Sequence, residues 1–380
     1  MAGISGTTDT PPPTISVASP RLVLEEVIAE ALVGPRPSYV AFSGGRDSSA
    51  VLALASAVAR ARDLPLPHPI TLRYPGDVES DESSWQELVI SHLGLDEWTI
   101  IVRKDASTYL DDGVRANLRR RGLIWPAALQ LELPELSAAS GGMLLTGEGG
   151  DEVLGTRRVT PLALMAHFHR RPSAALRRWA ADSATPRRAT AAAARRDLAG
   201  TALEQILTAE GKAQWVRRRV AEDRRPLHWG RETLRMARLR VPIVLAHNHQ
   251  LVADEHDVVV RNPLQDERFL RALAGAGGRW GFAGRTDLMR FLFADLLPDA
   301  LVRRSTKAHF GAVRWGAAER DFACRWDGDG VSESLLEPEA LRAEWLSDRP
   351  SGATALALQA AWLNSEGLPW TGVGTGVGSE

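Results

Sequence analysis

The feature that most constrains this chain is a short apolar run, a glycine turn and a helical segment that follow one another without a break. Tyr39 to Phe42 reads as a buried strand, and Ala50 to Ala61 holds almost nothing but helix-forming residues. The turn between them is SGGRDSS, and its side-chain donors are the hydroxyls of Ser43, Ser48 and Ser49. Such a turn presents backbone N–H groups at the positive end of a helix dipole. Because Gly44 and Gly45 also let the backbone approach a ligand closely, the turn predicts an anion site.

Two better-known phosphate-binding signatures are missing from this turn. It contains neither a GxxxxGK[ST] pattern nor a GxGxxG pattern. SGGRDSS instead resembles the pyrophosphate-binding loop (PP-loop) of the ATP pyrophosphatases, whose ligases adenylate a substrate and release pyrophosphate. The alternative is an ordinary tight turn before a serine-capped helix, but the position between a strand and an alanine-rich helix favours a nucleotide site.

Composition excludes several classes of protein. The 380 residues carry a formal net charge of −1, so no global field attracts nucleic acid or an anionic membrane. The single cysteine, Cys324, excludes an intramolecular disulfide and a cysteine-based zinc cluster. The sequence shows neither a signal peptide nor an apolar run of about 18 residues. We therefore expect a cytoplasmic protein without a nucleic-acid or membrane partner.

Strand and helix patterns alternate in the first part of the chain. Strand patterns at 70–74, 98–103 and 143–146 alternate with helical patterns that include 21–32 and 81–93. This alternation predicts an α/β fold with a doubly wound parallel sheet of the PP-loop type. In such sheets, ligands bind at the carboxyl ends of the strands.

Changes in composition divide the chain into four parts. Long Ala, Leu and Arg stretches with helical spacing dominate after the last strand pattern, and Pro and Gly residues crowd the two ends. We expect a disordered N-terminus at 1–18, a nucleotide-binding α/β part at 19–156, a mostly helical part at 157–366 and a flexible tail at 367–380.

A second glycine-rich turn follows the strand pattern at 143–146. It reads TGEGGDE, from Thr146 to Glu152, and carries three carboxylates. Because parallel strands end at one edge of a sheet, this turn and the SGGRDSS turn should lie close together. A solvated acidic turn is the plainer alternative, since buried carboxylates need cations. The pairing of the two turns at one edge favours a functional site.

Together, SGGRDSS and TGEGGDE resemble the synthetase domain of asparagine synthetase and its relatives, the β-lactam and carbapenam synthetases and the lasso-peptide macrolactam cyclases. Two later segments agree. RNPLQD, from Arg261 to Asp266, is similar to the family's Arg-x-Pro-Phe-Leu-Asp segment. Leu297-Pro298 followed by Arg303 to Lys307 is similar to its LP…R..K segment. The resemblance covers roughly residues 35–365 and implies the fold of an ATP pyrophosphatase.

The chain also departs from the family pattern. Family members usually begin with a glutaminase domain whose nucleophile is the cysteine after the initiator Met, whereas Ala2 follows Met1 here. We therefore expect that the chain does not make its own ammonia from glutamine. Val259, Leu264 and Gln265 stand where the family has Glu, Phe and Leu. The resemblance thus does not extend to asparagine-type substrate recognition.

The resemblance implies roles for particular residues. Asp47 and Asp151 match Mg²⁺ ligands, in keeping with hard oxygen ligands for a hard cation. Lys307 matches the lysine that neutralises developing phosphate charge. Glu148 matches a glutamate of asparagine synthetase, where β-lactam-forming relatives carry Tyr, and a glutamate there can orient the intermediate or take a proton from the amine. The pyrophosphate cradle comprises Ser43, Gly44, Gly45, Asp47, Ser48 and Ser49. The positions that match the adenosine pocket are Ala41, Leu72, Thr146 and Gly147.

The activity implied by the resemblance is that of an ATP- and Mg²⁺-dependent ligase that adenylates a carboxylate and couples it to an amine. We expect a substrate-borne amine, as in macrolactam or amide formation during peptide or natural-product biosynthesis. The expected partners are a small-molecule or peptide substrate and a separate carrier or leader-binding protein.

Other functions stay open at this point. One is asparagine synthetase-like amidation with ammonia, either free or from a separate glutaminase. Another is a tRNA-modifying PP-loop enzyme, and a third is a non-catalytic protein that keeps the fold. His247, His249 and His256 suggest a metal site, which no nearby cysteine supports.

Overall fold

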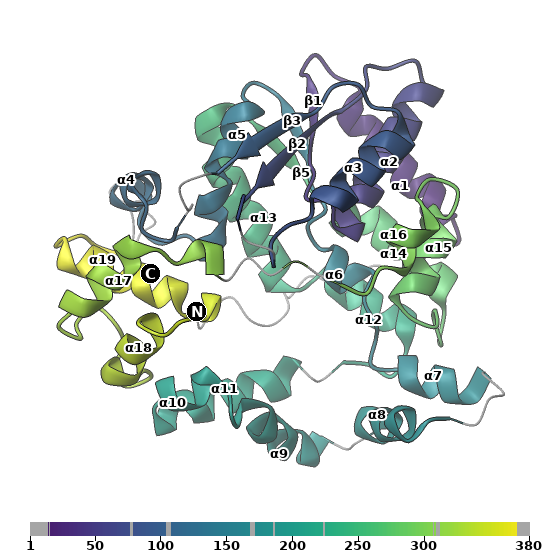
Figure 1. The fold of residues 1–380 in the computed structure, drawn as a ribbon. Helices are drawn as coiled ribbons and strands as arrows, with labels where there is room; N and C mark the ends of the chain where they lie inside the picture. The colour runs from purple at the N-terminus through teal and green to yellow at the C-terminus, as the bar shows by residue number, and fades with distance from the viewer. Residues whose placement is uncertain are drawn as a thin grey trace.

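Five parallel strands form the sheet that positions the rest of the chain (Figure 1). The computed structural model describes residues 14, 16–76, 79–103, 108–167, 172–184, 187–222, 225–306, 308 and 312–370. The strand order is β3-β2-β1-β4-β5, with bounds Thr99–Val102, His68–Arg73, Ser38–Ala41, Met143–Leu145 and Val259–Arg261. In the centre, Val40 of β1 stands opposite Pro69 of β2 and Leu145 of β4.

The predicted α/β class and the parallel sheet are confirmed, with one strand more than expected. The four predicted strands correspond to β1, β2, β3 and β4. The unpredicted strand is β5, in which Val260 pairs with Leu144 of β4. Three residues are too few to show a strand pattern, and they lie in the part predicted as mostly helical. The boundary at residue 156 stays a prediction, and the predicted N- and C-terminal tails lie mostly outside the described residues.

Helices cover both faces of the sheet. One face packs against α1 (Pro20–Leu32), α2 (Arg46–Ala61), α3 (Ser83–Leu93) and α14 (Glu267–Gly277). The other face packs against the short 3₁₀ helix η1 (Ala127–Glu132), α5 (Leu133–Ala138) and α13 (Arg240–Ala253). Side chains of a strand alternate between the faces, so neighbouring residues of β4 enter different cores, Leu145 the first and Leu144 the second.

A second helical group packs around tryptophans, beside the sheet. It consists of α4 (Asp112–Arg121), α17 (Ala317–Arg325), α18 (Pro338–Trp345) and α19 (Ala355–Ser365). Its core includes Trp315, Trp326, Trp345 and Trp362. Among the described residues, none of the helices has the length and apolarity needed to cross a membrane.

The remaining helices connect these parts. Figure 1 shows α7 to α11 in a row on the side away from the sheet, whereas α6, α12, α15 and α16 lie closer to it. Their bounds are α6 (Gly150–Val153), α7 (Thr160–His167), α8 (Ala174–Ala184), α9 (Arg187–Leu198), α10 (Ala202–Ile206), α11 (Ala209–Glu222), α12 (Trp229–Met236), α15 (Arg285–Phe293) and α16 (Asp299–Arg303).

Candidate active site

The two glycine-rich turns meet at the carboxyl ends of β1 and β4. The first turn leads into α2 and the second into α6. A Cβ atom at Gly147 would lie 2.6 Å from the backbone N of Ser48, and one at Gly150 would lie 2.2 Å from Cγ of Asp47. A side chain at either position would push the turns apart. The close approach of the two turns therefore depends on glycine at both positions.

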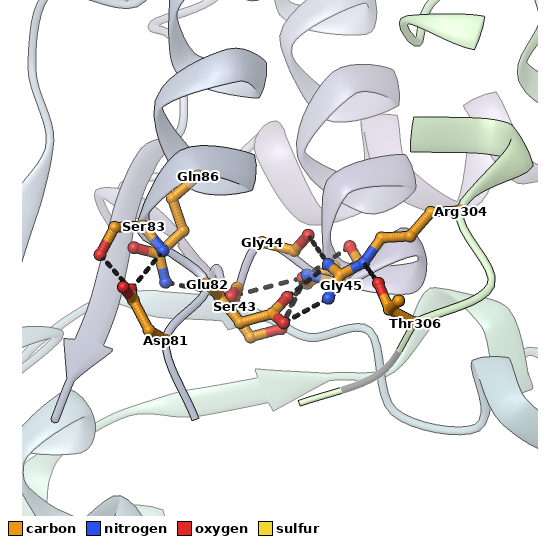
Figure 2. A network of polar contacts seen from close by, with 10 residues as sticks. Ser43, Gly44, Gly45, Asp81, Glu82, Ser83, Gln86, Arg304 and Thr306 are labelled. Atoms are coloured by element: carbon orange, nitrogen blue, oxygen red, sulfur yellow. Dashed lines mark hydrogen bonds and ion pairs between the residues drawn. The ribbon is translucent and has the colours of Figure 1, made fainter. Parts of the chain in front are cut away.

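The first turn is held in shape by its own serines and by α3 (Figure 2). Oγ of Ser48 lies 3.0 Å from Oγ of Ser43 and donates to the carbonyl of Gly45 at 3.2 Å. Gly44 has a φ of +84°, and a Cβ atom there would lie 2.7 Å from Cγ of Gln86. Nε2 of Gln86 also donates to the carbonyl of Ser43 at 3.1 Å. The turn is thus a preformed loop rather than a flexible one.

A buried ion pair attaches the LP…R..K segment to this turn. Arg304 donates from both terminal nitrogens to the carboxylate of Glu82, and the two side chains are 5% and 7% exposed. Nη1 of Arg304 also donates to the carbonyl of Gly44 at 3.3 Å, and its guanidinium lies 4.8 Å from the ring centroid of Trp85. Asp81, beside Glu82, makes no contact with Arg304 among the hydrogen bonds described: its carboxylate accepts hydrogen bonds from N and Oγ of Ser83 at the start of α3.

The RNPLQD segment packs against the second turn. N of Thr146 donates to the carbonyl of Arg261 at 3.0 Å, and Oγ1 of Thr146 donates to Oδ1 of Asn262 at 2.7 Å. A Cβ atom at Gly149 would lie 2.4 Å from Cγ of Gln265. All four motifs that carried the resemblance therefore meet at one edge of the sheet.

One guanidinium joins the two carboxylates that were predicted as Mg²⁺ ligands. Arg285, at the start of α15, donates from Nη2 to both carboxylate oxygens of Asp47 and from Nη1 to Oδ1 of Asp151, each at 2.5 Å. Burial raises the pKa of Asp47, and the charge of Arg285 opposes that rise. The carboxylates thus already surround one cation. Oxygen ligands of this kind, completed by phosphate oxygens, fit Mg²⁺.

A second part of the cavity wall is acidic. The cavity of about 500 Å³ is lined by both turns and by Glu132, Glu135 and His249 from η1, α5 and α13. Nε2 of His249 lies 3.3 Å from Oε2 of Glu132. Together with Glu148 of the second turn, these three residues form what we call the acidic wall.

Burial shifts the pKa values of the acidic wall toward neutrality. It raises the pKa of Glu132 to about 7. Burial and the charge of Glu132 together raise the pKa of Glu135 to about 8 and that of Glu148 to about 7. Burial also lowers the pKa of His249. The wall can therefore accept and release protons near neutral pH.

The cavity brings most of the predicted site residues together. Those that line it are Ala41, Ser43, Gly45, Asp47, Ser48, Thr146, Gly147, Glu148 and Asp151. Gly44, Ser49 and Leu72 are not among the described lining residues: Gly44 and Ser49 are buried, and Leu72 lies within β2. The Oγ atom of Ser49 has no hydrogen-bond partner in the described part of the chain. Lys307 lies outside the described residues, and its two neighbours in the chain line the cavity.

Sequence reasoning missed Arg285, Glu132 and Glu135. Arg285 lies 238 residues after Asp47, so no local pattern links them. One signal could have indicated Glu132 and Glu135. They are three residues apart, and they come just before a strand that ends at the site. The metal site suggested by His247, His249 and His256 gains no support, because no group of three or more His, Cys, Asp or Glu in the described ranges is arranged to hold a metal ion.

Comparison with known proteins agrees with this arrangement. The family model of asparagine synthase matches residues 20–365. All four motifs lie inside the matched range. No curated protein matches the chain.

Proposed function

The chain belongs to the asparagine synthase family of ATP-dependent amide-forming ligases, and we propose that it couples an adenylated carboxylate to an amine carried by a substrate. One observation carries the proposal: two glycine turns from different strands hold Asp47 and Asp151 around a single cation. A site that cleaves ATP between the α and β phosphates needs this pairing of a phosphate-binding turn with Mg²⁺ ligands.

The first turn supplies the pyrophosphate cradle. It joins the end of β1 to the N-terminus of α2, a helix of 16 residues whose N-cap residue is Gly45. Backbone N–H groups at such a helix end, together with the dipole, favour a phosphate. Ser43 and Gly45 line the cavity at this point. The loop is already folded, so binding requires little reorganisation of the backbone.

Asp47 and Asp151 would hold Mg²⁺, which neutralises phosphate charge when it is bound. Arg285 contacts the same oxygens. The guanidinium and a metal ion therefore compete for these carboxylates, and Arg285 keeps them together while ATP is absent. When Arg285 is displaced from the two carboxylates by Mg²⁺, the guanidinium stays at the cavity, where its positive charge is available to the phosphates.

The reaction proceeds in two steps. First, an oxygen of the substrate carboxylate attacks the α-phosphate of ATP, and pyrophosphate leaves with the electron pair of the broken P–O bond. Next, the amine attacks the acyl carbon, the C–N bond forms, and AMP leaves with the electron pair of the C–O bond. Glu148 lines the cavity and has a pKa of about 7, raised by burial, which suits a group that takes a proton from the amine.

We place this chemistry in peptide or natural-product biosynthesis, as macrolactam or amide formation, with a separate carrier or leader-binding protein as a partner. Two residues of the RNPLQD segment differ from the family pattern, and these differences support a substrate other than aspartate. Gln265 packs directly against Gly149 of the second turn, and Leu264 beside it is fully buried. Changes at these positions alter the surroundings of the second turn, where the acyl group would lie.

Product analysis tests the proposal. We expect the purified chain to convert ATP to AMP and pyrophosphate when Mg²⁺ and a suitable carboxylic acid are present, with pyrophosphate release depending on the acid. The acids to screen are amino acids and peptides, each with and without ammonium chloride. Formation of ADP and phosphate would contradict the proposal. Turnover that requires ammonium would assign the chain to ammonia-dependent amidation instead.

A further inference from the structure

Glu132 and Glu135 approach the cavity from short elements that precede β4. Glu132 ends η1, and Glu135 follows in the first turn of α5. Their spacing of three places both carboxylates on one side of this helical stretch. α13 packs against both elements and brings His249 to within 3.3 Å of Glu132. Three elements thus direct these side chains to one place.

Within the described part of the chain, the acidic wall lacks a paired positive charge. Among the described residues, no lysine or arginine forms an ion pair with Glu132, Glu135 or Glu148. The charge of Arg314 lowers the pKa of Glu132 without cancelling the rise that burial causes. Tyr74, Asp151 and Glu152 also interact with the wall, and the charges of Arg314 and Arg103 act on Tyr74. Half-buried carboxylates gathered in one cavity repel one another, so they either hold protons or join a cation.

His249 provides a second, independent sign of an absent ligand. Its side chain is 3% exposed and lines the cavity. Neither ring nitrogen has a hydrogen-bond partner in the described part of the chain, and the 3.3 Å contact with Glu132 lacks hydrogen-bond geometry. Buried polar atoms are rarely left without a partner, so such an atom beside a cavity indicates a missing polar group. The arrangement of the described groups does not suit a metal ion.

We propose that Glu132, Glu135 and His249 bind the acyl acceptor as a primary alkylammonium group, beside Glu148. The inference rests on the proposed function and specifies its substrate: the acceptor is a cationic amine attached to a larger molecule. An ammonium group has three N–H donors, which match several acceptors around it. The charge of the ammonium group offsets the repulsion among the carboxylates, and the described groups are not arranged to hold a metal ion.

The same wall can accept the proton that the amine must lose. The ammonium group gives one proton to a carboxylate of the wall, and the freed lone pair forms the C–N bond to the acyl carbon. The C–O bond to AMP breaks, and AMP takes its electron pair. A second proton then leaves the nitrogen to water. No oxidant or further reactant is needed.

Ligand-observed NMR of the full chain tests the subsite without ATP. The probes are n-butylammonium, the uncharged analogue n-butanol and ammonium. We expect n-butylammonium to bind, n-butanol to bind at least tenfold more weakly, and Glu132→Gln and Glu135→Gln each to weaken n-butylammonium binding by about tenfold or more. Glu97→Gln is the matched control, since its side chain is 89% exposed. Binding unchanged in both wall variants would overturn the proposal.

Two further arms keep the test decisive if a variant does not fold. His249→Asn should weaken n-butylammonium binding in the same direction. In the wild-type chain, binding should weaken at least tenfold between about pH 8.5 and pH 5.5, because the wall carboxylates gain protons. Equal binding of n-butanol, or binding of ammonium without n-butylammonium, would refute a substrate-borne amine. These experiments need no adenylation, so their failure is distinct from failure of the AMP and pyrophosphate assay.

Discussion

Two groups of carboxylates line the same cavity and differ in their partners. In the first group, Glu82 pairs with Arg304, and Asp47 and Asp151 share Arg285. In the acidic wall, no described arginine or lysine pairs with a carboxylate. Because each charge of the first group is compensated, that group needs no further ligand, whereas the acidic wall has to hold protons or take up a cation.

The first group also contains two kinds of ion pair. The side chains of Arg304 and Glu82 are 5% and 7% exposed, so this pair is closed to solvent and supports the glycine turn. Arg285, Asp47 and Asp151 are 20%, 18% and 48% exposed and face the cavity. The closed pair is therefore structural, whereas the open one can exchange its guanidinium for another cation.

The largest effect should come from the open carboxylates. Asp47→Asn or Asp151→Asn should lower pyrophosphate release by about a thousandfold, because each change removes a negatively charged ligand from the Mg²⁺ site. Pyrophosphate release at saturating ATP measures the effect. The control is Asp348→Asn, at an exposed position outside the cavity. Near wild-type rates in either site variant would show that the metal site lies elsewhere.

A smaller, more selective effect should follow from changing the acidic wall next to the second turn. Glu148→Gln should lower amide formation by about a hundredfold, because the glutamine cannot take a proton from the amine. Pyrophosphate exchange, which reports adenylation alone, should change only about twofold. Equal losses in both assays would mean that Glu148 acts in adenylation and would weaken the contrast between the two groups.

Removal of Arg285 should strengthen Mg²⁺ binding moderately, in contrast to the losses expected for the variants above. Arg285→Met removes the competitor for Asp47 and Asp151, so Mg²⁺ should bind about tenfold more tightly without nucleotide. Isothermal titration of the metal-free chain with MgCl₂ measures the change. Weaker Mg²⁺ binding would instead show that Arg285 is needed to hold the carboxylates in place.

The smallest effect concerns stability. The pKa of Glu135 is raised from 4.5 to about 8, mainly by burial, so the folded chain binds this proton more tightly than the unfolded chain. Its contribution to stability is complete below about pH 4.5 and is lost as the pH rises through about 8. Between these values the melting temperature should fall, and Glu135→Gln should reduce that fall by a few degrees. A fall of equal size in Glu135→Gln would contradict the raised pKa.

The sequence predicted the parts of this molecule that depend on neighbouring residues. SGGRDSS and TGEGGDE indicated the turns, because glycine spacing and a preceding strand are local signals. β5 and the acidic wall depend on contacts between distant segments. His249 meets Glu132 only because α13 packs against η1, and Arg285 reaches Asp47 across 238 residues. Such contacts leave no periodic trace in the sequence, so they became visible only in the folded chain.

The central claim is that the two groups of carboxylates bind different ligands. Binding measurements with two ligands and two variants test it most directly. Two ligands, a non-hydrolysable ATP analogue with Mg²⁺ and n-butylammonium, are titrated into Asp47→Asn and Glu135→Gln. We predict that Asp47→Asn loses the nucleotide and keeps the ammonium probe, whereas Glu135→Gln keeps the nucleotide and loses the probe. A variant that loses both ligands while remaining folded, or Glu135→Gln losing only the nucleotide, would contradict the account.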